Sequence, residues 1–545
     1  METREYGWHL VDEVLAGRLS RRELFRRAAV AGIGASAIGT LLAACSTDKG
    51  SSSSLASKST PKRGGSLTVA QGPVTTDVDP ISAYSAGAGA LIAAACEPLV
   101  INVPPNGLAP CLATSWHPIS PSEWEFQLRR GVKFQDGTLM TSADVVASFQ
   151  TLTSNPESAS LSSFQGILSK DGIEATGKYS VRFHLEQPFV DFPYLLTYGT
   201  NVVILPKDYK IGDFIKGKVG TGPFILSSFS PSVGARFVRN PDYWGAPRPY
   251  LDEYVVNFYS DPSAQLVALE GNNAQVFSNI DFDSARALKN NPNFKVLEQP
   301  GSGYRELSMR VDRSPWTDVR VRQALALTLN RPEIVSGVLG GFGRVANDHG
   351  FAWYFAGAPT IAEVPQRAQN IAMAKQLLAD AGYPHGLSAT LTTEEYLEIP
   401  TYVTAVKAQA AMAGFNISLD IEPQNTYYGS GNNQPWLDVP LGVVDWATRP
   451  VAPLLVDPAY TCGAVWNSAH WCNPRYTALV TEYAKVFDAS TRRRLAVAAA
   501  QIQHDQVPAI IAYWLTGLVV MRSNVEGFNS YIVDAPSEPG AIWLS

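Results

Sequence analysis

The sequence predicts a mixed α/β fold divided into more than one lobe, and three observations support this prediction. Removing a 44-residue head from the 545 residues leaves 501, which is more than one hydrophobic core usually organises, so we expect two or three lobes. Segments in which polar and apolar residues alternate, typical of strands, are interspersed with segments of helical periodicity. Apolar residues make up 46% of the chain and charged residues 17%, a composition typical of globular proteins.

The head of the chain, residues 1–44, resembles an export signal. Arg21 and Arg22 stand shortly before a Leu-Phe pair, as in twin-arginine signals, and residues 28–44 carry no charge and are rich in Ala, Gly and Leu. Residues 42–45, Leu-Ala-Ala-Cys, resemble a bacterial lipobox, in which the thiol of Cys45 becomes the lipid attachment point. The alternative is a retained membrane anchor with an ordinary cysteine. Both interpretations place the body of the protein at the outer face of the cytoplasmic membrane, on its periplasmic or cell-wall side.

The segment after the head predicts a tether. Residues 45–63 are rich in Ser and lack apolar periodicity, so we expect a lipidated, flexible linker. Removing the six basic and five acidic residues of the head from totals of 43 and 49 leaves 37 and 44, a net charge near −7. A nucleic-acid-binding protein would normally be basic, so the charge does not favour nucleic acid as a partner.

The first third of the body contains clear strand and helix signals. We expect a strand at 65–70, an Ala-rich helix ending near Cys96, a strand at 123–128 and a helix at 142–152. Thr141 and Asp144 form a capping box at the start of that last helix, because each side chain can bond an otherwise unpaired amide.

The rest of the chain continues as mixed strand and helix units. Predicted strands lie at 235–238, 254–259, 294–297, 387–392 and 417–421. Predicted helices follow the caps Asp261, Thr317 or Asp318 and Asn330, and others cover 370–381, the segment from Pro474 and the segment from Ser490. Two apolar strands, 509–514 and 517–521, close the prediction.

Besides Cys45 the chain has four cysteines, Cys96, Cys111, Cys462 and Cys472. An even number in an exported protein favours disulfides, and of the three possible connectivities the sequence-local one, Cys96 with Cys111 and Cys462 with Cys472, closes the shortest loops. His470 raises the alternative of a zinc site, but the spacing lacks the close pairs of structural zinc sites.

Motifs of common enzymes do not fit the chain. Residues 172–178 and 212–218 match the GxxxxGK pattern, yet Tyr179 and Val219 stand where Ser or Thr must coordinate magnesium. The chain contains no GxSxG or HExxH motif, and its seven histidines show no ligand spacing. We therefore expect no enzyme activity, cofactor or metal, with a hydrolase acting on peptides or glycans as the alternative.

A series of short motifs follows one order along nearly all of the body. They are GGSLTVA (64–70), ATSW (113–116), RRGVKFQDG (129–137), TSADVVASF (141–149), VGTGPF (219–224), RNPDYW (239–244), DVRVRQAL (318–325) and ADAGYP (379–384). This series resembles extracellular solute-binding family 5, the peptide and nickel class that serves ATP-binding cassette importers. The resemblance implies a two-lobed, periplasmic-binding-protein-like fold with mixed sheets, an extra subdomain in the first lobe and a ligand cleft at the hinge.

The resemblance also implies a division of the chain. We expect residues 64–300 and 515–545 to form lobe 1, with an inserted subdomain at about 97–200, and residues 301–514 to form lobe 2. The chain would cross between the lobes near 299–306 and 508–518, which would act as the hinge. Such a protein would work as a monomer that closes around a small solute and then docks on a permease driven by a cytoplasmic ATPase.

The strongest candidate for a binding stretch is residues 441–450, LGVVDWATRP, where an apolar run changes abruptly to acid, aromatic and base. In family members that bind peptides, a carboxylate in this region pairs with the ligand's amine, which implies that role for Asp445. Arg449 could hold a ligand carboxylate, and Trp446 offers an aromatic face. The alternative is an Asp445–Arg449 salt bridge at a strand end, with Trp446 in the core.

Tyr84, Tyr304 and Trp466 are further candidates for ligand contacts, although most aromatic residues fill cores. The resulting hypothesis is a lipid-anchored receptor for peptides or peptide-like solutes. Nickel chelates, opines and oligosaccharides remain alternative ligands, and a surface protein that binds a partner chain in its cleft is a further alternative.

Overall fold

The computed structural model describes residues 60–545 except 75–77, 84, 104–106, 279, 431–432, 530–535 and 537. Residues 61–545 form one compact unit. The predicted export signal, Cys45, nearly all of the predicted linker and Tyr84 lie outside the described residues.

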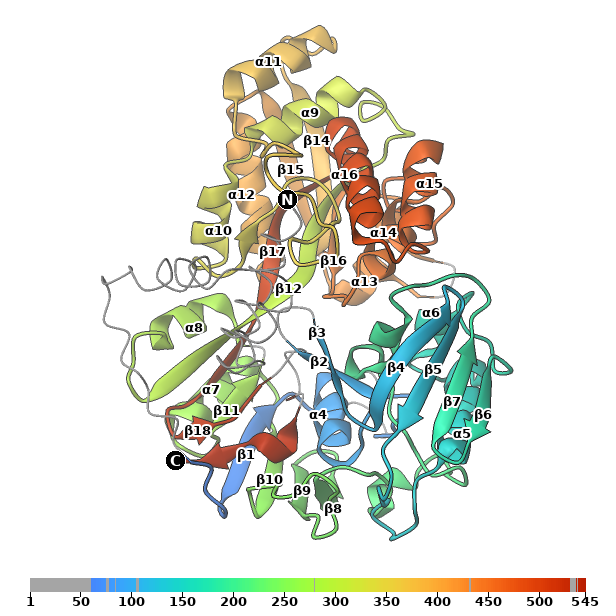
Figure 1. The fold of residues 1–545 in the computed structure, drawn as a ribbon. Helices are drawn as coiled ribbons and strands as arrows, with labels where there is room; N and C mark the ends of the chain where they lie inside the picture. The colour runs from blue at the N-terminus through green and yellow to red at the C-terminus, as the bar shows by residue number, and fades with distance from the viewer. Residues whose placement is uncertain are drawn as a thin grey trace, which may run out of the picture. The chain divides into compact units, whose positions relative to one another are not determined.

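A mixed sheet of 11 strands runs through this unit (Figure 1). Its strands lie in the order β15-β14-β16-β12-β17-β11-β1-β10-β9-β8, and β13 pairs with β17. The bounds are β1 (Ser66–Gln71), β8 (Phe224–Ser230), β9 (Gly234–Arg239), β10 (Glu253–Phe258), β11 (Val276–Ser278), β12 (Phe294–Met309), β13 (Arg344–Val345), β14 (Leu387–Glu394), β15 (Phe415–Glu422), β16 (Leu441–Trp446) and β17 (Ala509–Arg522).

The long strands β12 and β17 lie side by side in the middle of the sheet (Figure 1). They pair antiparallel from Phe294 opposite Arg522 to Ser308 opposite Ala509, and the register shifts on both sides of Tyr304. One end of β17 packs into a hydrophobic cluster with β1 and β8–β10, whereas its other end packs against clusters built from later helices. The predicted lobe boundaries near residues 300 and 515 stay predictions.

Residues 97–205 form smaller sheets and short helices of their own. Their elements are β2 (Val100–Val103), β3 (Gly107–Pro110), β4 (Ala113–Ser120), β5 (Glu123–Leu128), α5 (Ser142–Ser154), α6 (Leu161–Phe164), β6 (Ile173–Gly177) and β7 (Ser180–His184). Phe126, Phe149 and Phe183 meet edge to face in the cluster beneath them. The predicted capping box is confirmed, because Asp144 accepts hydrogen bonds from both the amide and the hydroxyl of Thr141.

Helices cover the sheet elsewhere. They are α4 (Ala86–Ala95), α7 (Pro262–Glu270), α8 (Phe282–Leu288), α9 (Val319–Thr328), α10 (Arg331–Val338), α11 (Ile371–Asp380), α12 (Ile399–Ala411), α13 (Gln424–Tyr428), α14 (Pro453–Tyr460), α15 (Pro474–Tyr483) and α16 (Ala489–Gln506). The predicted caps are confirmed at Asp261, Asp318 and Asn330, whose side chains accept bonds from amides two or three residues ahead. Helices α9–α12 and α14–α16 contribute to two separate hydrophobic clusters, which share β12, β16 and β17.

Three local predictions need correction. The strands predicted at 509–514 and 517–521 are one continuous strand, β17, and the strand predicted at 294–297 continues to Met309 as β12. Helix α16 begins one residue earlier than the predicted Ser490, because Asp488 caps it by accepting a bond from the amide of Thr491. β18 (Val525–Glu526) and β19 (Trp543–Leu544) add a short pair near the C-terminus.

The four cysteines behave differently in pairs. Cys462 and Cys472 form the predicted disulfide, which also removes the zinc alternative because thiolate ligands are no longer present. Cys96 and Cys111 are free and buried, so the predicted bond between them is not formed. Burial raises the pKa of both thiols, which keeps them protonated and unreactive.

A buried ion pair joins the 97–205 segment to the C-terminal helices. Arg492 donates to both carboxylate oxygens of Asp191, and its guanidinium also lies 4.2 Å from the ring centroid of Tyr483. The amide of Val190 donates to the carbonyl of Ala484 at 2.9 Å. These contacts hold the segment against the part of the chain that follows β16.

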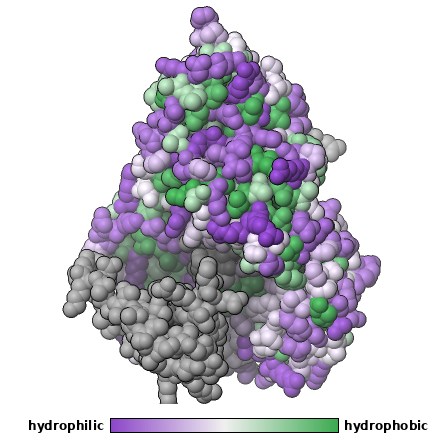
Figure 2. Space-filling view, turned by 45° about the horizontal axis from the view of Figure 1, so that its top comes forward, coloured by the Kyte–Doolittle hydropathy of each residue, from purple (hydrophilic) through white to green (hydrophobic). Residues whose placement is uncertain are grey.

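The surface mixes polar and apolar residues. On the face shown in Figure 2, hydrophilic residues separate groups of hydrophobic ones. The exposed large hydrophobic side chains include Ile361 and Val465, far apart in the chain, and single exposed residues of this kind are normal. Within the described residues, no helix combines the length and the apolar character needed to cross a bilayer.

Candidate functional site

The predicted binding stretch ends strand β16, which pairs antiparallel with β12. Trp446 lies opposite Tyr304, and Asp445 lies opposite Arg305. Neighbouring side chains of a strand point to opposite faces, so the acid and the aromatic residue meet different surroundings. The structure therefore brings Asp445, Trp446 and Tyr304 together at one place in the sheet, but on two faces.

Asp445 forms an ion pair with Arg305. The Arg305 guanidinium also binds Glu398, with its Nη2 3.1 Å from Oε2 and its Nε 2.8 Å from Oε1. The side chains of Arg305 and Glu398 are 3% and 5% exposed, whereas that of Asp445 is 24% exposed. One buried cation thus serves two carboxylates, and only Asp445 reaches towards solvent.

A third carboxylate, Glu394, lies close to this group. The backbone amide of Asp445 donates to the hydroxyl of Tyr428, which in turn donates to Glu394 at 3.0 Å. Gln424 donates to the other oxygen of Glu394 at 2.7 Å. Burial raises the pKa of Glu394, and Asp445 raises it further. Burial and Glu398 likewise raise the pKa of Asp445, although Arg305 offsets part of this increase.

Arg449 does not pair with Asp445, so that form of the salt-bridge alternative is wrong. Within the described part of the chain, its guanidinium donates to one acceptor, the carbonyl of Thr448, at 3.4 Å. Among the described residues, no carboxylate oxygen comes within the 4.0 Å that defines an ion pair with it. Burial lowers the pKa of Arg449, while Asp445 acts from a greater distance to raise it.

Trp446 lies in the core, as the alternative interpretation proposed, and binds a carboxylate that the sequence analysis missed. Its indole N–H donates to Glu306 at 2.6 Å. The hydroxyls of Tyr460 and Ser468 also donate to Glu306, both at 2.9 Å. Glu306 is fully buried, and burial raises its pKa to about 7 although the three hydrogen bonds act in the opposite direction.

The other aromatic candidates surround Trp446. Tyr304 is fully buried, stacks on Trp446 at 6.1 Å and shares a 2.9 Å hydrogen bond with the hydroxyl of Tyr460. Trp466 is half-buried, and its ring meets that of Trp446 edge to face, with 6.0 Å between the ring centroids. Their roles as ligand contacts stay predictions, as does that of Tyr84.

The sequence did contain a signal for the missed charges. Arg305 and Glu306 interrupt an otherwise apolar or neutral strand, residues 302–309. A charged residue in a buried strand needs a partner, so this pair indicates polar or charged partners on a neighbouring strand. The partners themselves could not be named, because they depend on which strands lie side by side.

A cavity of about 390 Å³ lies beside this group. Arg305, Glu398 and Thr448 line it together with residues 515–518 of β17 and residues at the start of α8 and the end of α10. The cavity is therefore built from the segments where the chain was predicted to cross between lobes. Pockets at such junctions are common ligand sites.

Comparison with known proteins decides the family. Residues 107–465 match the model of the bacterial extracellular solute-binding proteins, family 5 Middle. This range is more than half of the chain. The chain belongs to the family 5 solute-binding proteins. This confirms the family predicted from the motif series.

Relatives of this solute-binding protein bind different solutes. The glutathione-binding protein GsiB of Escherichia coli (strain K12) is 26% identical over 412 residues, which cover 70% of this chain and 76% of GsiB. The structure of DppA from Helicobacter pylori in complex with the peptide STSA superposes with a TM-score of 0.70 at 22% identity. The match covers 89% of this chain and 98% of the DppA chain. NikZ from Campylobacter jejuni, solved with Ni(L-His), has a TM-score of 0.68 and 19% identity, with coverages of 87% and 97%. The likenesses confirm the two-lobed fold, and the range of solutes means that the fold alone does not choose the ligand.

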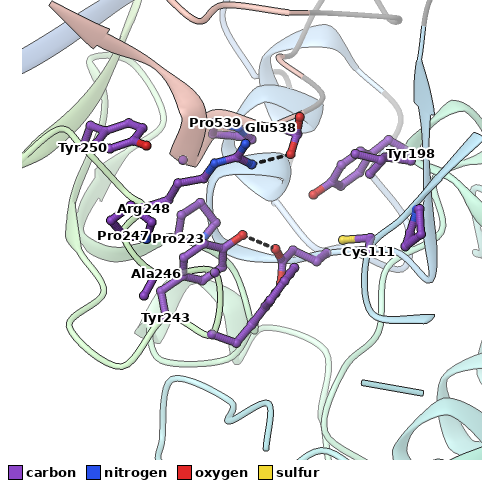
Figure 3. A pocket seen from close by; sticks show the side chains of 16 residues that line it. Cys111, Tyr198, Pro223, Tyr243, Ala246, Pro247, Arg248, Tyr250, Glu538 and Pro539 are labelled. Carbon is purple, nitrogen blue, oxygen red and sulfur yellow. Dashed lines mark hydrogen bonds and ion pairs between the residues drawn. The ribbon is translucent and has the colours of Figure 1, made fainter. Parts of the chain in front are cut away.

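The solute-binding protein has a second cavity, of about 380 Å³, far from β16 in the chain (Figure 3). Arg248 and Glu538 form an ion pair in its wall, and Tyr243 donates to the buried Glu97 at 2.7 Å. Trp244 and Thr221 also donate to Glu97, at 2.7 and 2.8 Å. Burial raises the pKa of Glu97 to about 7, while these bonds and the charge of Arg129 act in the opposite direction.

Proposed function

We propose that this solute-binding protein captures peptides or peptide-like solutes by lobe closure and delivers them unchanged to the permease of an ATP-binding cassette importer. Membership of the family supports capture outside the cytoplasm. The names of GsiB and of the DppA complex support a peptide or a related compound. The NikZ complex keeps a metal chelate as the competing ligand class, although no group of three His, Cys, Asp or Glu suited to a metal occurs among the described residues.

The observation that carries the peptide proposal is the presence of both charge signs at the end of β16. Asp445 and Arg449 are four residues apart, each is partly exposed, and they do not neutralise each other in an ion pair. A peptide carries an ammonium at one end and a carboxylate at the other, and charge-assisted hydrogen bonds to both are stronger than neutral ones. The proposed ligand-binding residues are Asp445, Trp446, Arg449, Tyr84, Tyr304 and Trp466, of which Trp446 and Tyr304 are buried in the structure.

Lobe closure in this proposal uses the two crossing strands. We propose lobe 1 as residues 64–300 and 515–545 and lobe 2 as residues 301–514, so that β12 and β17 bend near their register shifts. A ligand would shift a pre-existing open and closed equilibrium through contacts that only the closed form makes.

Two measurements test the proposal: the identity of the solute that the protein binds, and whether the protein alters that solute chemically. Native mass spectrometry of the purified protein should show one bound peptide or peptide-like solute per chain, and calorimetry with a peptide library should show saturable binding. After prolonged incubation the recovered peptides should keep their masses. Hydrolysed products would favour the hydrolase alternative, and retention of Ni(II) complexes alone would favour the chelate.

Membrane attachment is a separate proposal. We propose that Cys45 is the first residue of the mature protein and carries lipid. A Cys45→Ser variant should then move from the membrane fraction to the medium or periplasm, and intact-mass measurement of the unchanged protein should show the added acyl chains. An unmodified Cys45 in a membrane-bound protein would support the retained anchor instead.

A further inference from the structure

The two charged residues at the end of β16 differ in what already binds them. Asp445 is paired with Arg305, whose side chain is 3% exposed and is held on its other side by Glu398. Arg449 has no carboxylate partner among the described residues. A ligand ammonium at Asp445 would share a carboxylate that is already bound, whereas a ligand carboxylate at Arg449 would be its first ionic partner.

We propose that Arg449 is the main charged anchor of the ligand and that the ligand presents a carboxylate to it, with Asp445 in a lesser role. This inference rests on the proposed function and names the end of the solute that is recognised. A partly buried guanidinium has lost part of its hydration and gains from a fixed anionic partner. Its planar fork can bind both oxygens of a carboxylate at once.

The backbone of Arg449 is held in place by the crossing strand. Its amide donates to the hydroxyl of Ser302 at 2.8 Å, and that hydroxyl donates to the carbonyl of Arg449 at 2.7 Å. Ser302 is fully buried, between Gly301 and Gly303. The anchor is therefore fixed directly to β12 at the point where its pairing with β17 shifts.

The two glycines allow this close approach. A Cβ on Gly301 would stand 2.7 Å from the carbonyl oxygen of Leu515 and 2.8 Å from the Oγ1 of Thr448, and one on Gly303 would stand 2.9 Å from the carbonyl oxygen of Trp446. Real Cβ atoms essentially never come so close, so larger residues would push the segment of Thr448 and Arg449 away. Because Thr448 also lines the cavity of about 390 Å³, the segment that carries the anchor borders that space.

The test uses one randomised tetrapeptide library made in three forms: with both ends free, with an amidated C-terminus and with an acetylated N-terminus. Binding to the full-length protein is measured by calorimetry and by mass spectrometry of the retained peptides. Amidation should weaken binding by about 10-fold to 100-fold, the range expected for loss of a charged hydrogen-bonded pair, whereas acetylation should weaken it less than about threefold. The reverse order, or equal effects, would overturn the inference.

Variants assign the effect to the side chain. Arg449→Gln should bind the free and amidated libraries equally weakly, and Arg449→Lys should restore part of the preference because it keeps the charge but loses the planar fork. Arg313→Gln, an exposed arginine paired with Asp438 at 3.6 Å, serves as the matched control and should bind like the unchanged protein. Thermal melting of each variant shows whether it is folded. A folded Arg449→Gln variant that still prefers the free carboxylate would also overturn the inference.

A failure of the proposed function gives a different result. If no form of the library binds, the peptide proposal is rejected. The solute that co-purifies with the protein then tests whether Arg449 binds a carboxylate. A solute with a carboxylate that is present in the unchanged protein and absent from Arg449→Gln would support the inference. A solute without an acidic group, or no retained solute at all, would overturn it.

Discussion

Two buried carboxylates in different regions, Glu97 and Glu306, are held by closely similar sets of donors. Each receives one indole N–H, one phenol O–H and one aliphatic hydroxyl. The donors are Trp244, Tyr243 and Thr221 for Glu97, and Trp446, Tyr460 and Ser468 for Glu306. In both cases burial raises the pKa to about 7.

Their surroundings differ. Glu97 borders a cavity of about 380 Å³ and is influenced by the charge of Arg129. Glu306 is fully buried, and no cation among the described residues is a cause of its pKa shift. The comparison shows that three neutral donors can hold a carboxyl group in a core. Access to water and a nearby charge should then decide how far removal of the carboxyl group lowers the free energy of unfolding.

Removing each carboxyl group should produce the largest difference between the two regions. Glu306→Ala removes the acceptor of the buried Trp446 indole N–H and leaves Tyr460 and Ser468 with only their hydroxyl partners Tyr304 and Ser308. It should lower the free energy of unfolding by about 3 to 5 kcal/mol. Glu97→Ala should cost about 2 kcal/mol, because water in the adjoining cavity can satisfy some donors. Chemical denaturation measures both values.

The control for this pair is Glu298→Ala, which removes an exposed carboxylate paired with Lys289 and should cost less than about 1 kcal/mol. Equal losses for Glu97→Ala and Glu306→Ala would show that the cavity does not supply water to the donors.

Removing one donor from each set should have an intermediate effect. Trp446→Phe and Trp244→Phe each take away one N–H from a buried carboxyl group, at an expected cost of about 1.5 to 3 kcal/mol. Trp353→Phe, at a 38% exposed tryptophan stacked on Arg344, is the matched control and should change stability little. If Trp446→Phe resembled this control in denaturation curves, the indole bond to Glu306 would not contribute to stability.

The pH dependence of stability tests the two carboxyl groups without removing them. Because the folded pKa of each glutamate is about 7 against an ordinary 4.5, the folded state keeps protons that the unfolded state releases between these values. Their contribution to stability is complete below about pH 4.5 and is lost as the pH rises to about 7.

The side chains introduced by Glu306→Gln and Glu97→Gln cannot ionise. In each variant the melting temperature should therefore fall by a few degrees less between pH 4.5 and pH 7 than in the unchanged protein. The measurement is thermal melting in a pH series, with each variant compared with the unchanged protein. A slope that stays the same in both variants would mean that neither carboxyl group titrates in this range.

Local features were predictable from the sequence, and distant pairings were not. The caps at Asp261, Asp318 and Asn330 depend on residues two or three positions away, so the local sequence is enough to find them. The partners of Asp445 and Trp446, Arg305 and Glu306, lie 140 positions away and become visible only when β12 pairs with β16.

One prediction and one alternative are wrong for the same reason. The predicted Cys96–Cys111 bond and the alternative Asp445–Arg449 pair both join residues that are close in sequence, and the structure forms neither. Closeness along the chain does not imply that two side chains point towards each other, since strand direction and packing decide this. The same rule did succeed for Cys462 and Cys472, which stand at the two ends of one short loop.

The place of β17 in the sheet has a consequence for biosynthesis. This strand comes from residues 509–522, yet it is the one that pairs with both β11 and β12. A ribosome that has made the first 500 residues has therefore released two strands whose facing edges still lack their common neighbour. Open edges of this kind invite aggregation, so we expect the nascent chain to need shielding until residues 509–522 emerge and join them.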